Sequence, residues 1–349
     1  MVNNCSNKSL VYNIIKALAV LSVLLFHTVN VNGDYGAFRP MVISAELGGL
    51  ASALHLVNMP LFMAASGCVF GRCLELGKYK KNSELIAKKA KRLLLPNFFF
   101  GCFLVAPVMV FCGMTDLNYL QYVVKGIFLS ADSRHLWYLT ALFWIFCLGA
   151  LLKPACGGKY PWYLPVSVGL FAVAAIGQLP NVLQLGNALH FQLYFFIGVF
   201  INDYYDCLLS GLRRARFLLL PACPLLFAAV VPFAGNGLVD LSAALAGIVY
   251  LVVLADWLAA KYPCITENIF YRLLNRNGFG IYLFHPAIIY LLYYQLTSYP
   301  INPYVLALMV FSTALTGSVA LTEFLRRLHL GVVMGEKCRP VASVARYLK

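Results

Sequence analysis

The feature that most constrains this chain is a series of long apolar segments that recurs from one end to the other. A helix needs about 20 apolar residues to cross the hydrocarbon core of a bilayer, and most of these segments approach that length. A backbone in lipid must satisfy its own hydrogen bonds, so each segment is predicted to be an α-helix. The segments lie at 11–31, 48–71, 93–113, 136–152, 161–180, 188–204, 216–234, 238–259, 278–297 and 303–325.

The polar residues are too few for a soluble protein of this size. Of 349 residues, 61% are hydrophobic and only 11% are charged, against about 25% charged residues in soluble proteins. This composition excludes a soluble enzyme, a disordered protein and a secreted disulfide scaffold. We therefore predict an all-α, polytopic integral membrane protein with about ten transmembrane helices. Residues 1–349 are expected to form a single membrane-embedded domain, with no substantial soluble domain.

The basic residues are distributed unevenly between the connecting segments. If both termini are cytoplasmic, 23 Lys and Arg lie on the inner side and 3 on the outer side. Cytoplasmic loops of membrane proteins collect Lys and Arg, so this split predicts cytoplasmic termini. The same rule explains the net charge of +14 without a nucleic-acid partner.

The cysteines give no sign of a metal site. The 11 Cys include no CxxC pair and no Cys/His cluster with zinc spacing. Most lie inside apolar runs, where a free cysteine behaves as a small buried hydrophobic residue. We expect neither a disulfide framework nor a bound metal.

Two ionisable residues lie inside the first apolar segment, where a charge is costly and is a functional candidate by default. Lys16 and His27 are eleven residues apart. This spacing is about three helical turns, so both side chains share one helix face, roughly 16 Å apart along the axis. Taken alone, Lys16 is explained equally well as a lysine that snorkels to the interface. Taken alone, His27 is explained equally well as a hydrogen-bonded core histidine. Together they suggest a polar track through the bundle.

A basic run occupies the loop predicted before the third apolar segment. It contains Lys88, Lys89, Lys91 and Arg92, followed by Pro96. Most runs of this kind anchor a loop to anionic lipid. The alternative is a phosphate site, because basic residues three apart on a helix can grip a polyphosphate together. Charge alone does not decide between the two.

Several short motifs, taken in order, give the chain a family resemblance. They are Lys16 to His27 in the first segment, Pro60 to Gly67 in the second, Lys89, Arg92 and Pro96 before the third, His135 to Trp137, Ile281 to His285, and Glu323. Each motif alone is weak, but all six in register with a ten-helix topology resemble the membrane-bound acyltransferase family 3, the O-acetylases of bacterial surface glycans. The resemblance runs over nearly the whole chain.

The chain departs from the family pattern at several positions. Asn13 stands where the family often has Asp, and lysines replace expected arginines at Lys16 and Lys89. A lysine does not reproduce the bidentate fork of arginine. Contacts to phosphate are still expected at these positions, with a different geometry.

The resemblance implies a membrane-bound O-acyltransferase of the bacterial cytoplasmic membrane. It would move an acetyl or other short acyl group from cytoplasmic acetyl-CoA, or a related acyl-CoA, to a hydroxyl of a lipid-linked or cell-surface sugar at the outer side. Such a reaction would modify a polysaccharide of the cell envelope. The expected partners are acyl-CoA, the glycan acceptor and membrane lipid.

The resemblance also implies roles for individual residues. His27 is expected to be the general base, since imidazole suits this task near neutral pH. Lys16 and Glu323 are expected to support catalysis. Acyl-CoA is expected to bind Lys16, Lys88, Lys89, Lys91 and Arg92, and the acceptor-side or structural residues are expected to be Ser66, His135, Trp137, Tyr282 and His285.

Two other classes of function are compatible with the apolar segments. A multi-span transporter would use Lys16 and His27 as a proton or substrate path, and its helices would be interrupted in two matching halves. We find no such pairing in the sequence. The third class is a non-catalytic membrane subunit that binds lipid or glycan.

Overall fold

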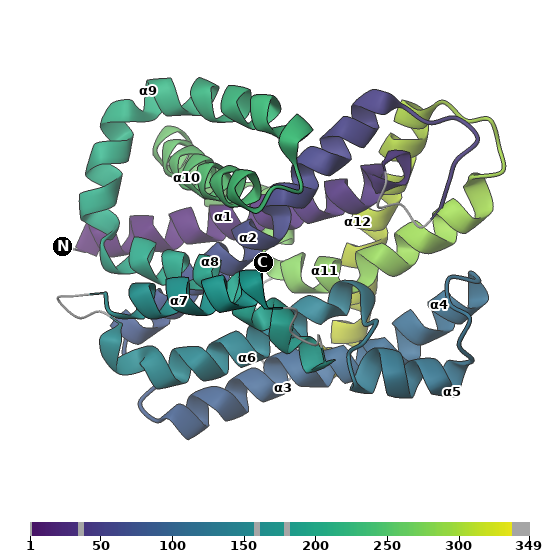
Figure 1. The fold of residues 1–349 in the computed structure, drawn as a ribbon, viewed down its shortest axis with the longest axis horizontal. Helices are drawn as coiled ribbons and strands as arrows, with labels where there is room; N and C mark the ends of the chain where they lie inside the picture. Colours follow the sequence, from purple (N-terminus) through teal and green to yellow (C-terminus); the bar gives the residue numbers. More distant parts are fainter. Residues whose placement is uncertain (1, 34–37, 157–160, 178–181, 337–349) are drawn as a thin grey trace.

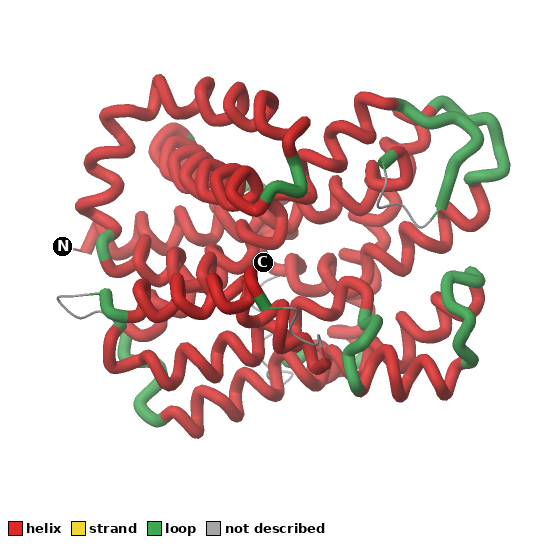
Figure 2. Tube along the Cα trace, in the orientation of Figure 1, coloured by secondary structure: helices red, strands yellow, loops and turns green. Residues whose placement is uncertain are grey.

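The predicted fold class is confirmed by the structure, a computed structural model that describes residues 2–33, 38–156, 161–177 and 182–336. These residues form helices and connecting loops, with no β-strand among them (Figure 2). Within these ranges, nine helices are long and apolar enough to cross a membrane. The predicted segment 161–180 contains a shorter helix, α7 (Tyr163–Ile176).

The long helices extend beyond most of the apolar segments that predict them. Charged and polar residues such as Lys, Glu and Gln are good helix formers, so a helix continues past the apolar stretch. The basic run shows this most clearly, because Lys88–Arg92 lies inside a helix and not in the predicted loop. The principal helices are α1 (Val2–Val29), α2 (Ala45–Glu75), α3 (Asn82–Phe100), α6 (Trp137–Leu152), α8 (Leu185–Asp203), α9 (Tyr205–Val230), α10 (Gly237–Lys261), α11 (Ile269–Leu296) and α12 (Pro303–Arg327).

Helix α2 lies at the centre of the bundle and packs against α1, α8 and α10. Helix α11 packs against α1 and α12, while α3 packs against α6 and α7 against α8. Helix α9 arches over α10 in Figure 1. Short elements complete the chain between α3 and α6: η2 (Gly101–Val105), α4 (Ala106–Phe111), α5 (Tyr119–Gln121), η3 (Tyr122–Phe128) and η4 (Arg134–Leu136).

Glycines allow α2 and α8 to cross in close contact. A Cβ atom at Gly67 would stand 1.8 Å from the carbonyl oxygen of Phe195, and one at Gly198 would stand 2.0 Å from that of Ala64. The two backbones therefore touch. Small residues four apart allow such close approach between membrane helices, and Gly67 and Gly71 have this spacing.

The connecting segments gather at two ends of the bundle. At one end, Lys8 Nζ lies 3.0 Å from Glu75 Oε2, and Lys153 Nζ donates to the carbonyl of Tyr79. At the other end, the backbone N–H of Met41 donates to the carbonyl of Thr297 at 3.1 Å. The charge count assigns the first group to the cytoplasm and the second to the outer side, so the two ends match the predicted alternation. Which end faces the cytoplasm stays a prediction.

We expect cysteine labelling to show the first end in the cytoplasm. In a chain whose native cysteines have been replaced, Lys78→Cys and Ser298→Cys place one thiol at each end, both at exposed positions. A membrane-impermeant thiol reagent added to intact cells should label residue 298 and spare residue 78 until the membrane is opened. Labelling of residue 78 in intact cells would reverse the orientation.

Candidate active site

Helix α1 carries Lys16 and His27 on one face, and each meets a different group of side chains. Lys16 interacts electrostatically with Arg92 on α3 and with Cys73 on α2. The ring of His27 lies 5.1 Å from the ring of His285 on α11. One face of α1 therefore joins a group of cations to a group of imidazoles.

Three histidines from three different segments form the first group, which we call the histidine cluster: His27, His135 and His285. The ring centroids of His135 and His285 are 6.0 Å apart. His285 is 1% exposed and His135 is 7% exposed, whereas His27 is partly exposed. His27 is thus the most exposed member of the cluster.

His285 is held by the backbone of its own helix. Pro286 lacks an N–H group for the carbonyl of Tyr282, which loosens the helix at this turn. The imidazole Nδ1 of His285 lies 2.7 Å from the carbonyl oxygen of Ile281. A carbonyl only accepts, so Nδ1 carries the hydrogen and Nε2 is a bare acceptor. This Nε2 is buried and has no hydrogen-bond partner among the described residues.

His135 is held by α11 from two sides. Its Nε2 lies 3.3 Å from the carbonyl oxygen of Leu283, and its own carbonyl accepts a hydrogen bond from the hydroxyl of Tyr282. Its Nδ1 is buried and has no partner within the described part of the chain. By the same reasoning, this nitrogen is a bare acceptor. The His-Leu-Trp and Ile-Tyr-Leu-x-His motifs, far apart in sequence, therefore hold each other in place.

Hydroxyl and aromatic side chains lie between the histidine cluster and the cations. The Tyr138 hydroxyl is 2.8 Å from the Ser66 hydroxyl, and the Tyr138 ring is 5.7 Å from that of Tyr282. Tyr282 in turn stacks on Phe279 at 6.2 Å. The structure thus brings together Ser66, His135, Tyr282 and His285 from the predicted acceptor-side set.

Three cations form the second group, which we call the cationic group: Lys16, Lys89 and Arg92. Lys89 Nζ lies 3.6 Å above the ring of Phe146, and the Arg92 guanidinium lies 5.6 Å from the ring of Phe279. No ion pair between described residues involves any of the three cations. The group therefore has positive charge available for an anion.

The structure divides the four basic residues of α3 into two pairs. Lys89 is half-buried and lies over the ring of Phe146 on α6, and Arg92, although exposed, lies beside the ring of Phe279 on α11. Lys88 pairs with Glu84 on the exposed side of its own helix, and Lys91 is exposed. Residues three apart share a helix face, which explains the division.

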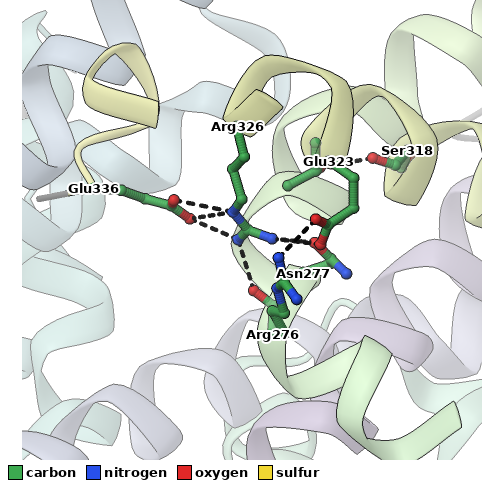
Figure 3. A network of polar contacts seen from close by, with 7 residues as sticks. Arg276, Asn277, Ser318, Glu323, Arg326 and Glu336 are labelled. Carbon is green, nitrogen blue, oxygen red and sulfur yellow. Dashed lines mark hydrogen bonds and ion pairs between the residues drawn. The ribbon is translucent and has the colours of Figure 1, made fainter. Parts of the chain in front are cut away.

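Glu323 lies outside the histidine cluster. Its carboxylate binds Arg276 and Arg326, each at 2.8 Å, within the network of α11 and α12 shown in Figure 3. Arg326 also contacts the side chain of Asn277, which precedes His285 by eight residues on α11. Eight residues span about 12 Å of helix. Glu323 therefore joins α11 to α12, and any support of catalysis would act through α11.

Trp137 also points away from the histidine cluster. Its ring lies 5.2 Å from that of Phe191 on α8. The adjacent Tyr138 makes the contact with Ser66. Tyr138 was not among the predicted site residues, although it directly follows the His-Leu-Trp motif.

Two further polar residues escaped sequence analysis. Asn97, five residues after Arg92 on α3, is fully buried, and both its amide atoms lack a partner among the described residues. The ring of His55 on α2 lies 5.6 Å from that of Phe26, which neighbours His27. A lone Asn or His within an apolar run gives no pattern that would have distinguished it.

A cavity of about 580 Å³ lies at the end of the bundle that holds Lys8 and Glu75. Its two lysines, Lys8 and Lys153, are already bonded to neighbouring groups, and three acids line it as well. The cavity is therefore a poorer place for a polyphosphate than the cationic group. The described residues contain no group of three His, Cys, Asp or Glu side chains arranged to hold a metal ion.

Comparison with known proteins identifies one family. A sequence model described as an acyltransferase domain matches residues 11–323. This range includes every motif residue discussed above, from Lys16 to Glu323. No curated protein and no solved structure matches the chain.

Proposed function

The chain belongs to acyltransferase family 3, and from this premise we propose that it transfers a short acyl group, such as acetyl, from acyl-CoA to a sugar hydroxyl. The acceptor is a lipid-linked or cell-surface glycan at the outer side of a bacterial cytoplasmic membrane. The observation that carries the proposal is the pairing, along one face of α1, of an unpartnered cationic group with the histidine cluster.

The cationic group suits the donor. The nucleotide end of acyl-CoA carries several phosphate charges, and phosphates bind best to Lys and Arg that have no other anion to satisfy. Lys16, Lys89 and Arg92 meet this condition. They also lie on the side that the charge distribution assigns to the cytoplasm, where acyl-CoA is present.

The side chains between the cationic group and His27 suit the thioester arm. They are Phe279, Tyr282 and the Tyr138–Ser66 pair. Aromatic faces and hydroxyl groups accommodate a chain that alternates methylene and amide groups. Along α1 the distance from Lys16 to His27 is about 16 Å, so the arm carries the acyl group toward the outer side.

His27 supplies the base for the transfer. Its imidazole takes the proton of the sugar hydroxyl while the oxygen attacks the thioester carbonyl. The new C–O bond forms, the C–S bond breaks, and the sulfur of CoA leaves with the electron pair. The proton passes from His27 to this sulfur, so acyl-CoA and alcohol become ester and CoA thiol with no net change in protons.

The rival transporter function finds less support. Transporters of this kind bind substrate where helices are interrupted in two matching halves. Helix α1 is continuous from Val2 to Val29, through both Lys16 and His27.

Neutralising Lys89 and Arg92, the two cations of α3 that lie beside aromatic rings of α6 and α11, should weaken donor binding. Each hydrogen bond to a charged group contributes about 1.5–3 kcal/mol, and about 1.4 kcal/mol is tenfold in affinity. We expect Lys89→Gln with Arg92→Gln to raise the Kd for CoA by tenfold or more. Titration calorimetry of the purified protein, at low and high salt, measures this change.

The matched control removes the same charge from the neighbouring face of α3, about 100° round the helix. We expect Lys88→Gln with Lys91→Gln to change the Kd for CoA by less than threefold. Equal loss in both double variants would indicate that the whole basic run attracts CoA, as the sequence alone predicts. If the affinity for CoA were unchanged in the Lys89 and Arg92 variant, these two residues would be structural and would not bind CoA.

A further inference from the structure

In the histidine cluster, His135 and His285 each have a bare acceptor nitrogen, and the His27 ring has an N–H donor that is not engaged. We propose that His285 is a positioning residue for His27: its Nε2 accepts the N–H of the His27 imidazole and leaves the other His27 nitrogen free to act as the base. This inference rests on the proposed function, in which His27 is the base.

The tautomer of His285 is set by its own helix. The bond from Nδ1 to the carbonyl of Ile281, at 2.7 Å, commits the ring hydrogen to Nδ1. The bare Nε2 is thereby fixed as an acceptor. It belongs to a residue that is 1% exposed, and it has no partner among the described residues. A buried acceptor without a donor calls for an explanation.

Only one histidine of the cluster has a donor that can reach His285 Nε2. His135 cannot serve, because its N–H on Nε2 is directed to Leu283 and its Nδ1 is itself a bare acceptor. The His27 ring is the nearest imidazole to His285, at 5.1 Å against 6.0 Å for His135. The His27 ring makes no hydrogen bond with any described residue. Its N–H is therefore the donor that the cluster has available.

A hydrogen bond to His285 would also set the tautomer of His27. A base works only in the right tautomer, and the hydrogen bond that one ring nitrogen makes decides which nitrogen is bare. An N–H···N bond to His285 fixes this choice for His27. When His27 has taken the hydroxyl proton, the same bond holds the imidazolium in place until the CoA sulfur takes that proton. His285 itself gains and loses no proton.

Two substitutions at residue 285 separate this role from a structural one. The amide of asparagine reaches the place of Nδ1 and can keep the bond to Ile281, but it leaves nothing at Nε2. The amide of glutamine reaches the place of Nε2 and keeps an acceptor there, but it loses the bond to Ile281. The positioning role needs the Nε2 acceptor, whereas a purely structural role needs the Nδ1 donor.

We expect His285→Asn to lose about 10–100-fold in kcat with an unchanged KM for acetyl-CoA, the range found when the hydrogen-bond partner of a metal-ligating histidine is removed. His285→Gln should keep a kcat within a few-fold of wild type. The measurement is acetyl transfer to membrane glycan from labelled acetyl-CoA, normalised to folded protein by gel filtration. Equal kcat in the two variants, or a higher kcat in His285→Asn, would overturn the positioning role.

The wild-type protein distinguishes failure of this inference from failure of the proposed function. If folded wild type binds CoA but transfers no acetyl group, the proposed function fails whatever the variants do. If wild type transfers acetyl and the order of the two variants is reversed, His285 is structural and the proposed function stands.

Discussion

Replacing His27 by alanine is expected to lower acetyl transfer by roughly 10²–10⁴-fold, the usual effect of removing a general base. The protein should still fold and bind acyl-CoA, because the cationic group lies about 16 Å away along α1. His27 is partly exposed and packs beside Phe26 and His285, so its loss leaves a gap at an accessible position. Initial rates of acetyl transfer, normalised to folded protein, measure the effect.

Variants that keep a polar side chain test the alternative for His27. A structural histidine would be replaced adequately by glutamine, which retains a hydrogen-bonding group of similar length. We expect His27→Gln to be as inactive as His27→Ala. Near-normal acetyl transfer by His27→Gln would show that His27 is not the general base. Lys16→Ala should instead impair donor binding, while Lys16→Arg should keep much of the activity, because it preserves the charge.

Substitution of Gly67 is expected to abolish the native bundle. Even the single methyl group of Gly67→Ala would stand 1.8 Å from the carbonyl oxygen of Phe195. This neighbour is backbone, so α2 and α8 would have to separate. Overpacking typically costs about 1–3 kcal/mol, and a clash between two backbones should exceed this range. Size-exclusion chromatography and thermal unfolding in detergent should show little monodisperse protein.

Gly49 on the same helix provides the control. A Cβ atom there meets nothing within 4 Å, and the residue is exposed. Gly49→Ala should therefore be neutral or slightly stabilising, because alanine favours a helix by about 1 kcal/mol over glycine. If Gly67→Ala gave the same yield and melting temperature as Gly49→Ala, the close crossing of α2 and α8 would be wrong.

The helical membrane fold could be predicted from the sequence, because the length of an apolar segment is set by the thickness of the bilayer. The ends of the helices could not. Polar residues continue a helix beyond the hydrocarbon region, and so Lys88–Arg92 lies within α3. The close crossing at Gly67 had a signal in the Gly67–Gly71 spacing, but spacing alone does not identify the helix that approaches.

The shared face of Lys16 and His27 followed from helical periodicity, since eleven residues are about three turns. Their partners could not be predicted in this way. The contact between His27 and His285, and the clamp of Tyr282 and Leu283 on His135, join segments more than a hundred residues apart. Helix packing makes these contacts, and no local spacing encodes them.

Glu323 and Trp137 lie outside the histidine cluster, although sequence motifs singled them out. Both belong to motifs that the family resemblance places at the site, yet Glu323 pairs with Arg276 and Arg326, and Trp137 packs on Phe191. A motif identifies residues without saying whether they meet the substrate or hold the helices that do. Their roles in catalysis stay predictions.

Transfer of label from acetyl-CoA to glycan is the most direct test of the proposed function. Inside-out membrane vesicles containing the protein present the cytoplasmic face to added [¹⁴C]acetyl-CoA. We expect label in the glycan fraction as an ester that mild alkali removes, no such label with His27→Ala, and none when sealed right-side-out vesicles receive the same donor. Absence of alkali-labile label with wild type, or equal label with His27→Ala, would contradict an acyl-CoA-dependent O-acyltransferase that uses His27 as its base.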